Sequence, residues 1–251
     1  MSNKLSALRN SVERLSTVVG GLGPGQVRQP AYPTEWTIAD TLSHIGSGAV
    51  ILRRRLEEVV HGGEVDATFN QTVWDEWNTK DPDAQATDAL IADRALLEGF
   101  ESLDDSQRAA FHLTMGPFDL DFTGFVGLRL NEHVLHTWDI EVMADPGAVL
   151  PSDASQAILD TLGMIVGFAG KPVGHERTVQ VATTAPDRAV AVTLGADSVQ
   201  MTVSEVGNGG DLEIPAEAFI RLVYGRLDPR HTPPAVDGPL LDDLRKAFPG
   251  F

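Results

Sequence analysis

Cysteine is absent from this chain of 251 residues. The protein therefore has neither disulfides nor a thiolate of its own, since both require cysteine. If its chemistry uses a sulfur nucleophile, that thiol must come from a separate small molecule. The composition agrees with a reducing compartment, and we expect a cytoplasmic protein.

Basic residues are also scarce. Lysine and arginine number 19 against 36 aspartates and glutamates, which gives a formal net charge of −17 and an isoelectric point near 4.6. This charge repels phosphate backbones and anionic lipid at long range, so we expect no nucleic-acid partner and no membrane partner. The chain also lacks a run of roughly 18 apolar residues, the length of a membrane span. Residues 1–19 are amphipathic and lack the unbroken apolar core of a signal peptide.

What the first half does contain is apolar residues at steps of three and four, the period of amphipathic helices. Thr37 begins T-I-A-D, a helix-capping pattern, and Asp83 is the expected cap of a later helix. The sequence TMGPFDLDF, residues 114–122, predicts a turn or a small hairpin. Four long helices predict a four-helix bundle. Their ranges are 3–19, 37–61, about 83–100 and about 123–143, with a short helix at 69–78.

In the second half the period changes to two after a helical stretch at 154–168, which predicts strands. A helix should start at Pro215, and a last one should cover 239–248. An antiparallel sheet with helices packed on it makes this half an α+β domain. We therefore expect two domains, a helical one at 1–150 and an α+β one at 151–251. The predicted strands are 178–184, 189–195, 199–206 and 211–214.

The segment LNEHVLHTWDI, residues 130–140, carries the first candidate for chemistry. Glu132 and His136 are four residues apart, so they lie one turn apart on one helical face, and Asp139 follows three residues later. On a bundle helix such a carboxylate and imidazole can converge on one metal ion. Zinc would want a third protein ligand and keep a fourth position open for catalysis.

His44 is the best third ligand, because it lies on the predicted inward stripe of the helix at 37–61. Asp40, one turn earlier, could orient its imidazole as a hydrogen-bond acceptor. Each feature also has an ordinary explanation. Most Glu-x-x-x-His pairs are surface contacts, and a lone core histidine is usually satisfied by packing. His133 points about 100° away from Glu132 and is expected to be exposed or packed.

Three segments together resemble a known family. They are WTIADTLSHI at 36–45, LNEHVLHTWDI at 130–140 and LEIPAEAFIRLVYGRL at 212–227. They are similar to the mycothiol-dependent maleylpyruvate isomerases, a branch of the DinB/YfiT-like metalloprotein superfamily. The resemblance implies a DinB-like four-helix bundle followed by a C-terminal domain related to sterol-carrier-type α+β folds. It covers both halves of the chain.

The same resemblance implies that His44, Glu132 and His136 bind the metal, with zinc expected and nickel or iron left open. It also implies mycothiol as the thiol cofactor. One glutamate where much of the superfamily has histidine lowers the net charge of the site to about +1. Such a site should activate a thiol less strongly than three histidines would, but it still favours the thiolate over the thiol.

Further residues are candidates for binding the thiol and the substrate. Trp36 and Asn70 could contact the thiol cofactor. Arg221 and Arg226, in R-L-V-Y-G-R, could hold a substrate carboxylate by charge-assisted hydrogen bonds. Arg226 could equally cap its helix or pair with the acidic surface.

The leading expectation is a metal-dependent, mycothiol-using enzyme of cytoplasmic detoxification, either an S-transferase or an isomerase. Its partners would be a low-molecular-weight thiol and a small electrophile, and it would be a monomer or a homodimer. The alternative is a non-catalytic, zinc-containing ligand-binding or regulatory protein, whose closed site would need a fourth ligand such as Asp40 or Asp139. A hydrolase that uses zinc-bound water is a third possibility, and it would turn over without thiol.

Overall fold

The computed structural model describes residues 3–33, 35–116, 118–204 and 210–250. The chain forms two compact units, Met1–Ala148 and Val149–Phe251. Helices dominate the first unit, and the second combines helices with a four-stranded sheet. The predicted α+β fold class is therefore confirmed.

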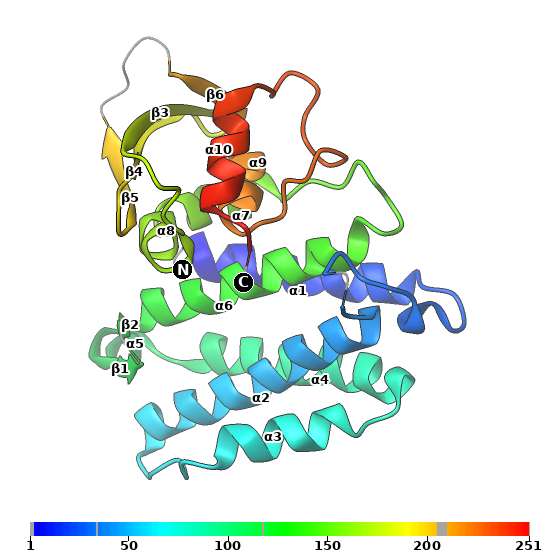
Figure 1. The fold of residues 1–251 in the computed structure, drawn as a ribbon. Helices are drawn as coiled ribbons and strands as arrows, with labels where there is room; N and C mark the ends of the chain where they lie inside the picture. Colours follow the sequence, from blue (N-terminus) through cyan, green and yellow to red (C-terminus); the bar gives the residue numbers. More distant parts are fainter. Residues whose placement is uncertain (1–2, 34, 117, 205–209, 251) are drawn as a thin grey trace. The chain divides into compact units, whose positions relative to one another are not determined.

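Four long helices build the first unit, and shorter elements connect them (Figure 1). The hairpin predicted around residue 117 is present as two strands on either side of it, and a short helix before it was not predicted. The long helices are α1 (Asn3–Gly20), α2 (Ile38–His61), α4 (Pro82–Ser102) and α6 (Phe122–Glu141). The shorter elements are η1 (Gln26–Arg28), α3 (Phe69–Asn78), α5 (Asp105–Ala110), β1 (His112–Met115) and β2 (Phe118–Asp121).

The four long helices associate as two pairs. Helix α2 packs mainly on α4, and α1 packs mainly on α6. The contact between α2 and α4 is close because of Gly46. A Cβ at that position would run into the Trp77 ring of α3 and lie 2.9 Å from the Cα of Ala89 in α4. The pairs join through thinner contacts of α1 with α4 and of α2 with α6.

Helices α2 and α4 both start at a side-chain cap, but the cap of α4 is not the residue that the sequence predicted. Thr37 caps α2 in a full capping box, in which its side chain accepts from the backbone N–H of Asp40 and the Asp40 carboxylate accepts from that of Thr37. Helix α4 is capped by Asp81 instead of the predicted Asp83. Pro82 occupies its first turn, where a missing N–H costs nothing.

The second unit contains a sheet with the strand order β5-β4-β3-β6. The elements are α7 (Ser152–Leu159), α8 (Leu162–Ala169), β3 (Arg177–Thr184), β4 (Arg188–Leu194), β5 (Val199–Ser204), β6 (Leu212–Pro215), α9 (Ala216–Val223) and α10 (Pro239–Ala247). The helix predicted at 154–168 is thus two helices. The predicted end of the third strand, 205–206, lies outside the described residues.

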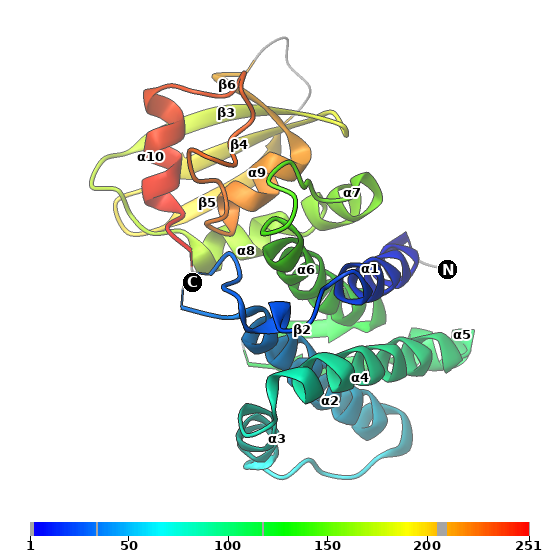
Figure 2. The same cartoon turned by 90° about the vertical axis from the view of Figure 1, so that its right-hand side faces the viewer.

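The sheet is mixed, whereas the sequence predicted an antiparallel one. Strands β3, β4 and β5 are antiparallel neighbours, but β6 runs parallel to β3, with Val181 opposite Leu212. Alternating apolar residues identify a strand and its buried face, but they carry no information about strand direction. Helix α8 packs against β5, α9 packs against β3 and β6, and α7 and α10 contact α9 (Figure 2).

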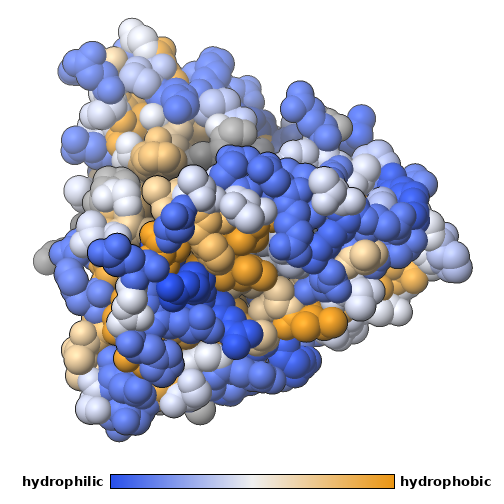
Figure 3. Space-filling model, turned by 90° about the horizontal axis from the view of Figure 1, so that it is seen from below, coloured by the Kyte–Doolittle hydropathy of each residue, from blue (hydrophilic) through white to orange (hydrophobic). Residues whose placement is uncertain are grey.

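One face of the molecule is mostly hydrophilic (Figure 3). Hydrophilic residues cover most of the face shown in Figure 3, and smaller hydrophobic areas lie between them. Over the part of the chain that the structure describes, the helices are too short or too polar to cross a membrane.

Candidate functional site

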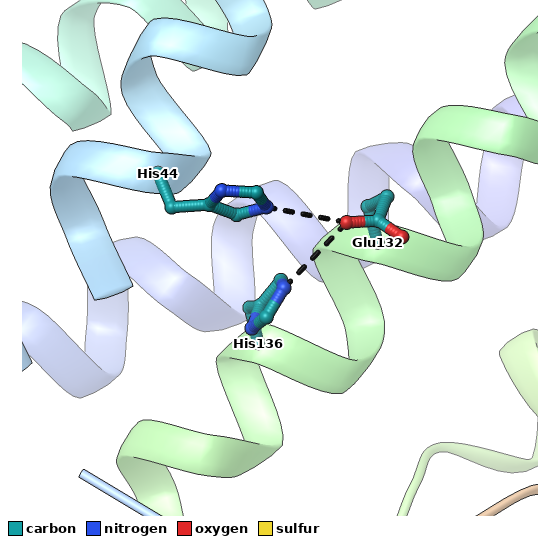
Figure 4. A group of neighbouring side chains, drawn as sticks. All are labelled: His44, Glu132 and His136. Carbon is teal, nitrogen blue, oxygen red and sulfur yellow. Dashed lines mark hydrogen bonds and ion pairs between the residues drawn. The ribbon is translucent and has the colours of Figure 1, made fainter. Parts of the chain in front are cut away.

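Helices α2 and α6 bring His44, Glu132 and His136 to one point (Figure 4). The Glu132 Oε2 atom lies 3.3 Å from the Nε2 of His44 and 3.5 Å from the Nε2 of His136. The donor atoms of the three side chains all lie within 4.8 Å of one another. These three residues are called the candidate metal site below.

The spacing of these atoms suits a metal ion. In a tetrahedral zinc site with bonds of about 2.0–2.1 Å, two ligand atoms lie roughly 3.3–3.4 Å apart. Both contacts of Glu132 fall at or close to that separation. Two imidazoles and one carboxylate are also a common donor set for catalytic zinc. The residues present therefore fit a divalent metal.

The site lies at the margin of the bundle. The side chains of His44 and Glu132 are 43% and 46% exposed, while that of His136 is 11% exposed. The expectation that His44 lies on the inward stripe of α2 is wrong. Its neighbours Ser43 and Ile45 are buried, and His44 projects from the edge of that stripe towards α6. A small molecule can therefore reach the three donor atoms from solvent.

Glu132 is an anion at any ordinary pH. Burial raises the pKa of its carboxyl, but hydrogen bonds and charge interactions with His136 and His44 lower that pKa by more, to well below its usual range. A carboxylate that is already ionised needs no proton removed before it binds a cation.

Asp139 fixes the orientation of the His136 ring. Its Oδ2 lies 2.9 Å from the Nδ1 of His136, and its side chain is fully buried. When Nε2 of His136 binds a metal, the remaining ring proton is on Nδ1, and Asp139 is placed to accept it. We predicted this role for Asp40 towards His44. Asp40 instead accepts hydrogen bonds from the backbone and hydroxyl of Thr37.

Trp36, predicted to line the site, stands beside it. Its ring centroid is 5.3 Å from that of His44 and 5.9 Å from that of His136, and it is stacked on the latter. Asn70 lies in the first turn of α3, and its Oδ1 is buried without a hydrogen-bond partner among the described residues. Asn70 is not one of the three residues that form the candidate metal site.

The two predicted arginines belong to the second unit. Arg221 is buried and bonds both carboxylate oxygens of Glu217 and the backbone carbonyls of Arg226 and His231. These partners use the donors that a substrate carboxylate would need. Arg226 is half-buried, and its Nη1 donates to the carbonyl of Tyr224, in agreement with the expectation that it could cap its helix.

The sequence interpretation missed a second polar cluster, formed by Ser11, Asp93, Arg129 and His133. All four are at least 95% buried. His133 lies next to Glu132 in the chain but projects into the bundle, where its Nε2 lies 2.5 Å from Asp93 Oδ2. The apolar stripes of the helices could have indicated this cluster. Asp93, Arg129 and His133 each interrupt an otherwise apolar face, which predicts paired buried charges.

The helical unit therefore defines a class of protein, a four-helix bundle with a His-Glu-His group suited to a divalent metal. Residues 8–141 match the family described as the mycothiol maleylpyruvate isomerase N-terminal domain. Because this match spans more than half of the chain, the protein belongs to that family.

Two solved structures are similar to the whole chain. A crystal structure of the mycothiol-dependent maleylpyruvate isomerase has a TM-score of 0.62 and 15% identity, and the match covers 93% of this chain and 95% of that one. A histidine-to-alanine mutant of that isomerase gives the same TM-score and identity, with 89% and 88% covered. At this identity the likeness shows a shared fold. Comparison with curated protein sequences gives no match.

Proposed function

We propose that this protein is a metal-dependent enzyme that joins the thiol of mycothiol to a small electrophile. The reaction is either S-conjugation or a thiol-assisted cis-trans isomerisation of a maleylpyruvate-like diacid. The observation that carries the proposal is the convergence of His44, Glu132 and His136 at a solvent-accessible point. Membership in the maleylpyruvate isomerase family supports mycothiol as the thiol.

The residues of the chain have separate roles in this proposal. His44, Glu132 and His136 hold the metal, for which zinc is the first candidate. Asp139 keeps the His136 ring in the tautomer that binds metal. Trp36 flanks both histidine rings, where it would contact the thiol cofactor. A bound zinc ion would lower the pKa of a thiol that reaches it, so that the thiolate is present near neutral pH.

The absence of cysteine makes an external thiol necessary for this chemistry. In conjugation by addition, the sulfur forms a bond to one carbon of an activated double bond and the π bond breaks. The neighbouring carbon takes up a proton from solvent, which balances the proton that the thiol loses. In isomerisation, addition of the sulfur turns a cis double bond into a single bond that can rotate. Elimination of the sulfur then restores the double bond in the trans form and releases the thiol.

A catalytic site is favoured over a structural metal site by the number of donors. Within the described residues, the group comprises only the three side chains. Both residues considered as a fourth ligand have other partners, since Asp40 belongs to the cap of α2 and Asp139 bonds His136. Three protein ligands leave a coordination position for a substrate or cofactor.

The test is turnover by zinc-loaded protein with and without mycothiol. We expect a thiol-dependent loss of maleylpyruvate or of a small test electrophile, and no reaction with His44→Ala. Equal turnover without thiol would support a hydrolase instead. Stoichiometric zinc binding without turnover of either substrate would support the non-catalytic ligand-binding or regulatory protein.

The variant Arg226→Ala tests whether Arg226 binds the carboxylate of an anionic substrate. If Arg226 donates to a substrate carboxylate, the variant should bind zinc as the wild type does but lose about 1–3 kcal/mol of binding to anionic electrophiles. Comparing KM for a neutral and an anionic electrophile measures this difference. Equal changes for both substrates would show that Arg226 does not bind a substrate carboxylate.

A further inference from the structure

The candidate metal site joins two helix pairs that are only thinly packed on each other. His44 belongs to α2, whose main partner is α4, whereas Glu132 and His136 belong to α6, whose main partner is α1. The separation of 3.3 Å between His44 and Glu132 therefore depends on the register between the pairs. Metal affinity requires that this register be held to within a fraction of an ångström.

Arg129 crosses the junction between the pairs. It lies on α6, one turn before Glu132, and its Nη2 donates to Asp93 Oδ1 on α4 at 2.7 Å. The same nitrogen donates at 3.0 Å to the backbone carbonyl of Ile45, the residue after His44 on α2. The guanidinium passes close to the α2 backbone, because a Cβ at Gly48 would lie 3.4 Å from its Nη1.

His133 extends the connection to the remaining helix. Its Nε2 faces Asp93 at 2.5 Å, and its Nδ1 lies 2.7 Å from the hydroxyl of Ser11 on α1. A serine, a histidine and an aspartate in a row suggest a nucleophile, but all three are at least 97% buried, so no substrate reaches the hydroxyl. Ser11, Asp93, Arg129 and His133, the buried polar network, instead link all four helices.

We propose that the buried polar network positions the two halves of the candidate metal site, by fixing the register of α2 and α4 against α1 and α6. This inference rests on the proposed function, since it assumes that His44, Glu132 and His136 bind a metal together. Arg129 is its central positioning residue, because it alone among the described side chains of the network contacts the α2 backbone beside His44.

The composition of the network favours positioning over stability. Burial raises the pKa of Asp93, but His133 and Arg129 lower it by more, so the carboxylate stays ionised at the centre of the bundle. The Nε of Arg129 is buried without a hydrogen-bond partner in the described part of the chain. Well-packed apolar residues would often stabilise such a core equally well, but directional hydrogen bonds fix one register.

The test replaces the whole network by apolar residues, in the triple variant Asp93→Leu, Arg129→Met and His133→Leu. Removing every charge together leaves no unpaired ion, so the fold should persist. We expect a melting temperature close to that of the wild type, but affinity for Zn²⁺ and Co²⁺ about tenfold weaker, as for other outer residues that orient ligands. The visible spectrum of bound Co²⁺ should also change, because its band intensities report coordination geometry.

Arg14→Gln is the matched control. Arg14 of α1 pairs with Glu141, the last residue of α6. This ion pair joins α1 to α6 and does not include a residue of α2. This variant loses a cross-helix ion pair and should keep wild-type metal affinity and the wild-type Co²⁺ spectrum. A merely structural network would make the triple variant behave like this control, and that result would overturn the proposal.

A milder variant, Arg129→Lys, covers the case in which the triple variant does not fold. Lysine keeps the charge beside Asp93 but lacks the planar fork that reaches Ile45 as well. Weaker metal binding with retained folding supports positioning, and unchanged affinity overturns it. Wild-type protein that binds no metal would instead remove the proposed function, so the two failures are distinguishable.

Discussion

Glu132 and His133 are neighbours in the sequence, yet their side chains reach opposite environments. The Glu132 carboxylate is half-exposed between two histidines, at a point that a ligand can reach. The His133 imidazole is fully buried between Asp93 and Ser11. Helix α6 thus contributes to two polar clusters. The candidate metal site is the open cluster, and the buried polar network is the closed cluster.

The two clusters contribute differently to the stability of the folded protein. At the half-exposed site, water still screens the attraction between the carboxylate and the histidines, so this attraction adds little to the stability of the metal-free protein. In the closed cluster the polar groups are buried away from water, so each one depends on the others for its hydrogen bonds. We therefore expect changes in the open cluster to affect ligand binding with little effect on folding. Removing a single member of the closed cluster should affect folding as well, because it leaves a buried partner unpaired.

The largest expected effect is on stability. Asp93→Ala leaves Arg129 buried without its counter-ion and should lower the free energy of unfolding by about 3–5 kcal/mol. Glu132→Ala, made in metal-free protein, should lower it by less than about 1 kcal/mol. Urea denaturation of both variants measures the contrast. Equal losses would mean that the two clusters do not differ as described.

A smaller effect, on zinc affinity, is expected for Asp139, which is buried and bonds His136 of the open cluster. Asp139→Asn keeps the shape of the side chain but weakens the hydrogen bond to His136 Nδ1, and should weaken zinc binding about 10- to 100-fold. Asp40→Asn, one turn before His44, is the control and should leave zinc affinity unchanged. Competition with a chromophoric chelator measures both. Equal affinities would contradict the orienting role of Asp139.

The smallest effect is a dependence on pH. The folded pKa of Asp93 is depressed, so its contribution to stability is present above the ordinary Asp pKa of about 4 and is lost as the pH falls below it. The stability difference between wild type and Asp93→Asn should shrink below that pH, by at most about 1.4 kcal/mol per pH unit. Parallel curves between pH 3 and pH 6 would contradict it.

Much of the fold follows from local patterns that the sequence displays openly. The period of the apolar residues located α1, α2, α4 and α6, and the cap at Thr37 located the start of α2. Strand direction did not follow, because β6 is placed parallel to β3 by a connection whose path no local pattern encodes. The short helix α5 has no buried residue, and so it has no apolar stripe to detect.

The candidate site could be predicted only in part. Helical spacing placed Glu132 and His136 on one face, and the helical stripe together with the resemblance to a family indicated His44. The orienting carboxylate was assigned to Asp40 because it lies one turn from His44, but Asp40 is used by the helix cap. The network around Asp93 joins residues up to 122 positions apart, and such pairings depend on tertiary packing.

Metal titration tests the central claim most directly, that His44, Glu132 and His136 hold one divalent ion. Isothermal titration of metal-stripped protein with Zn²⁺, followed by metal analysis, should give one ion per wild-type chain. His136→Ala should bind none at the same concentrations and remain folded in the metal-free state, because the bundle core rests on the apolar stripes of its helices. Undiminished zinc binding by folded His136→Ala protein would contradict the account.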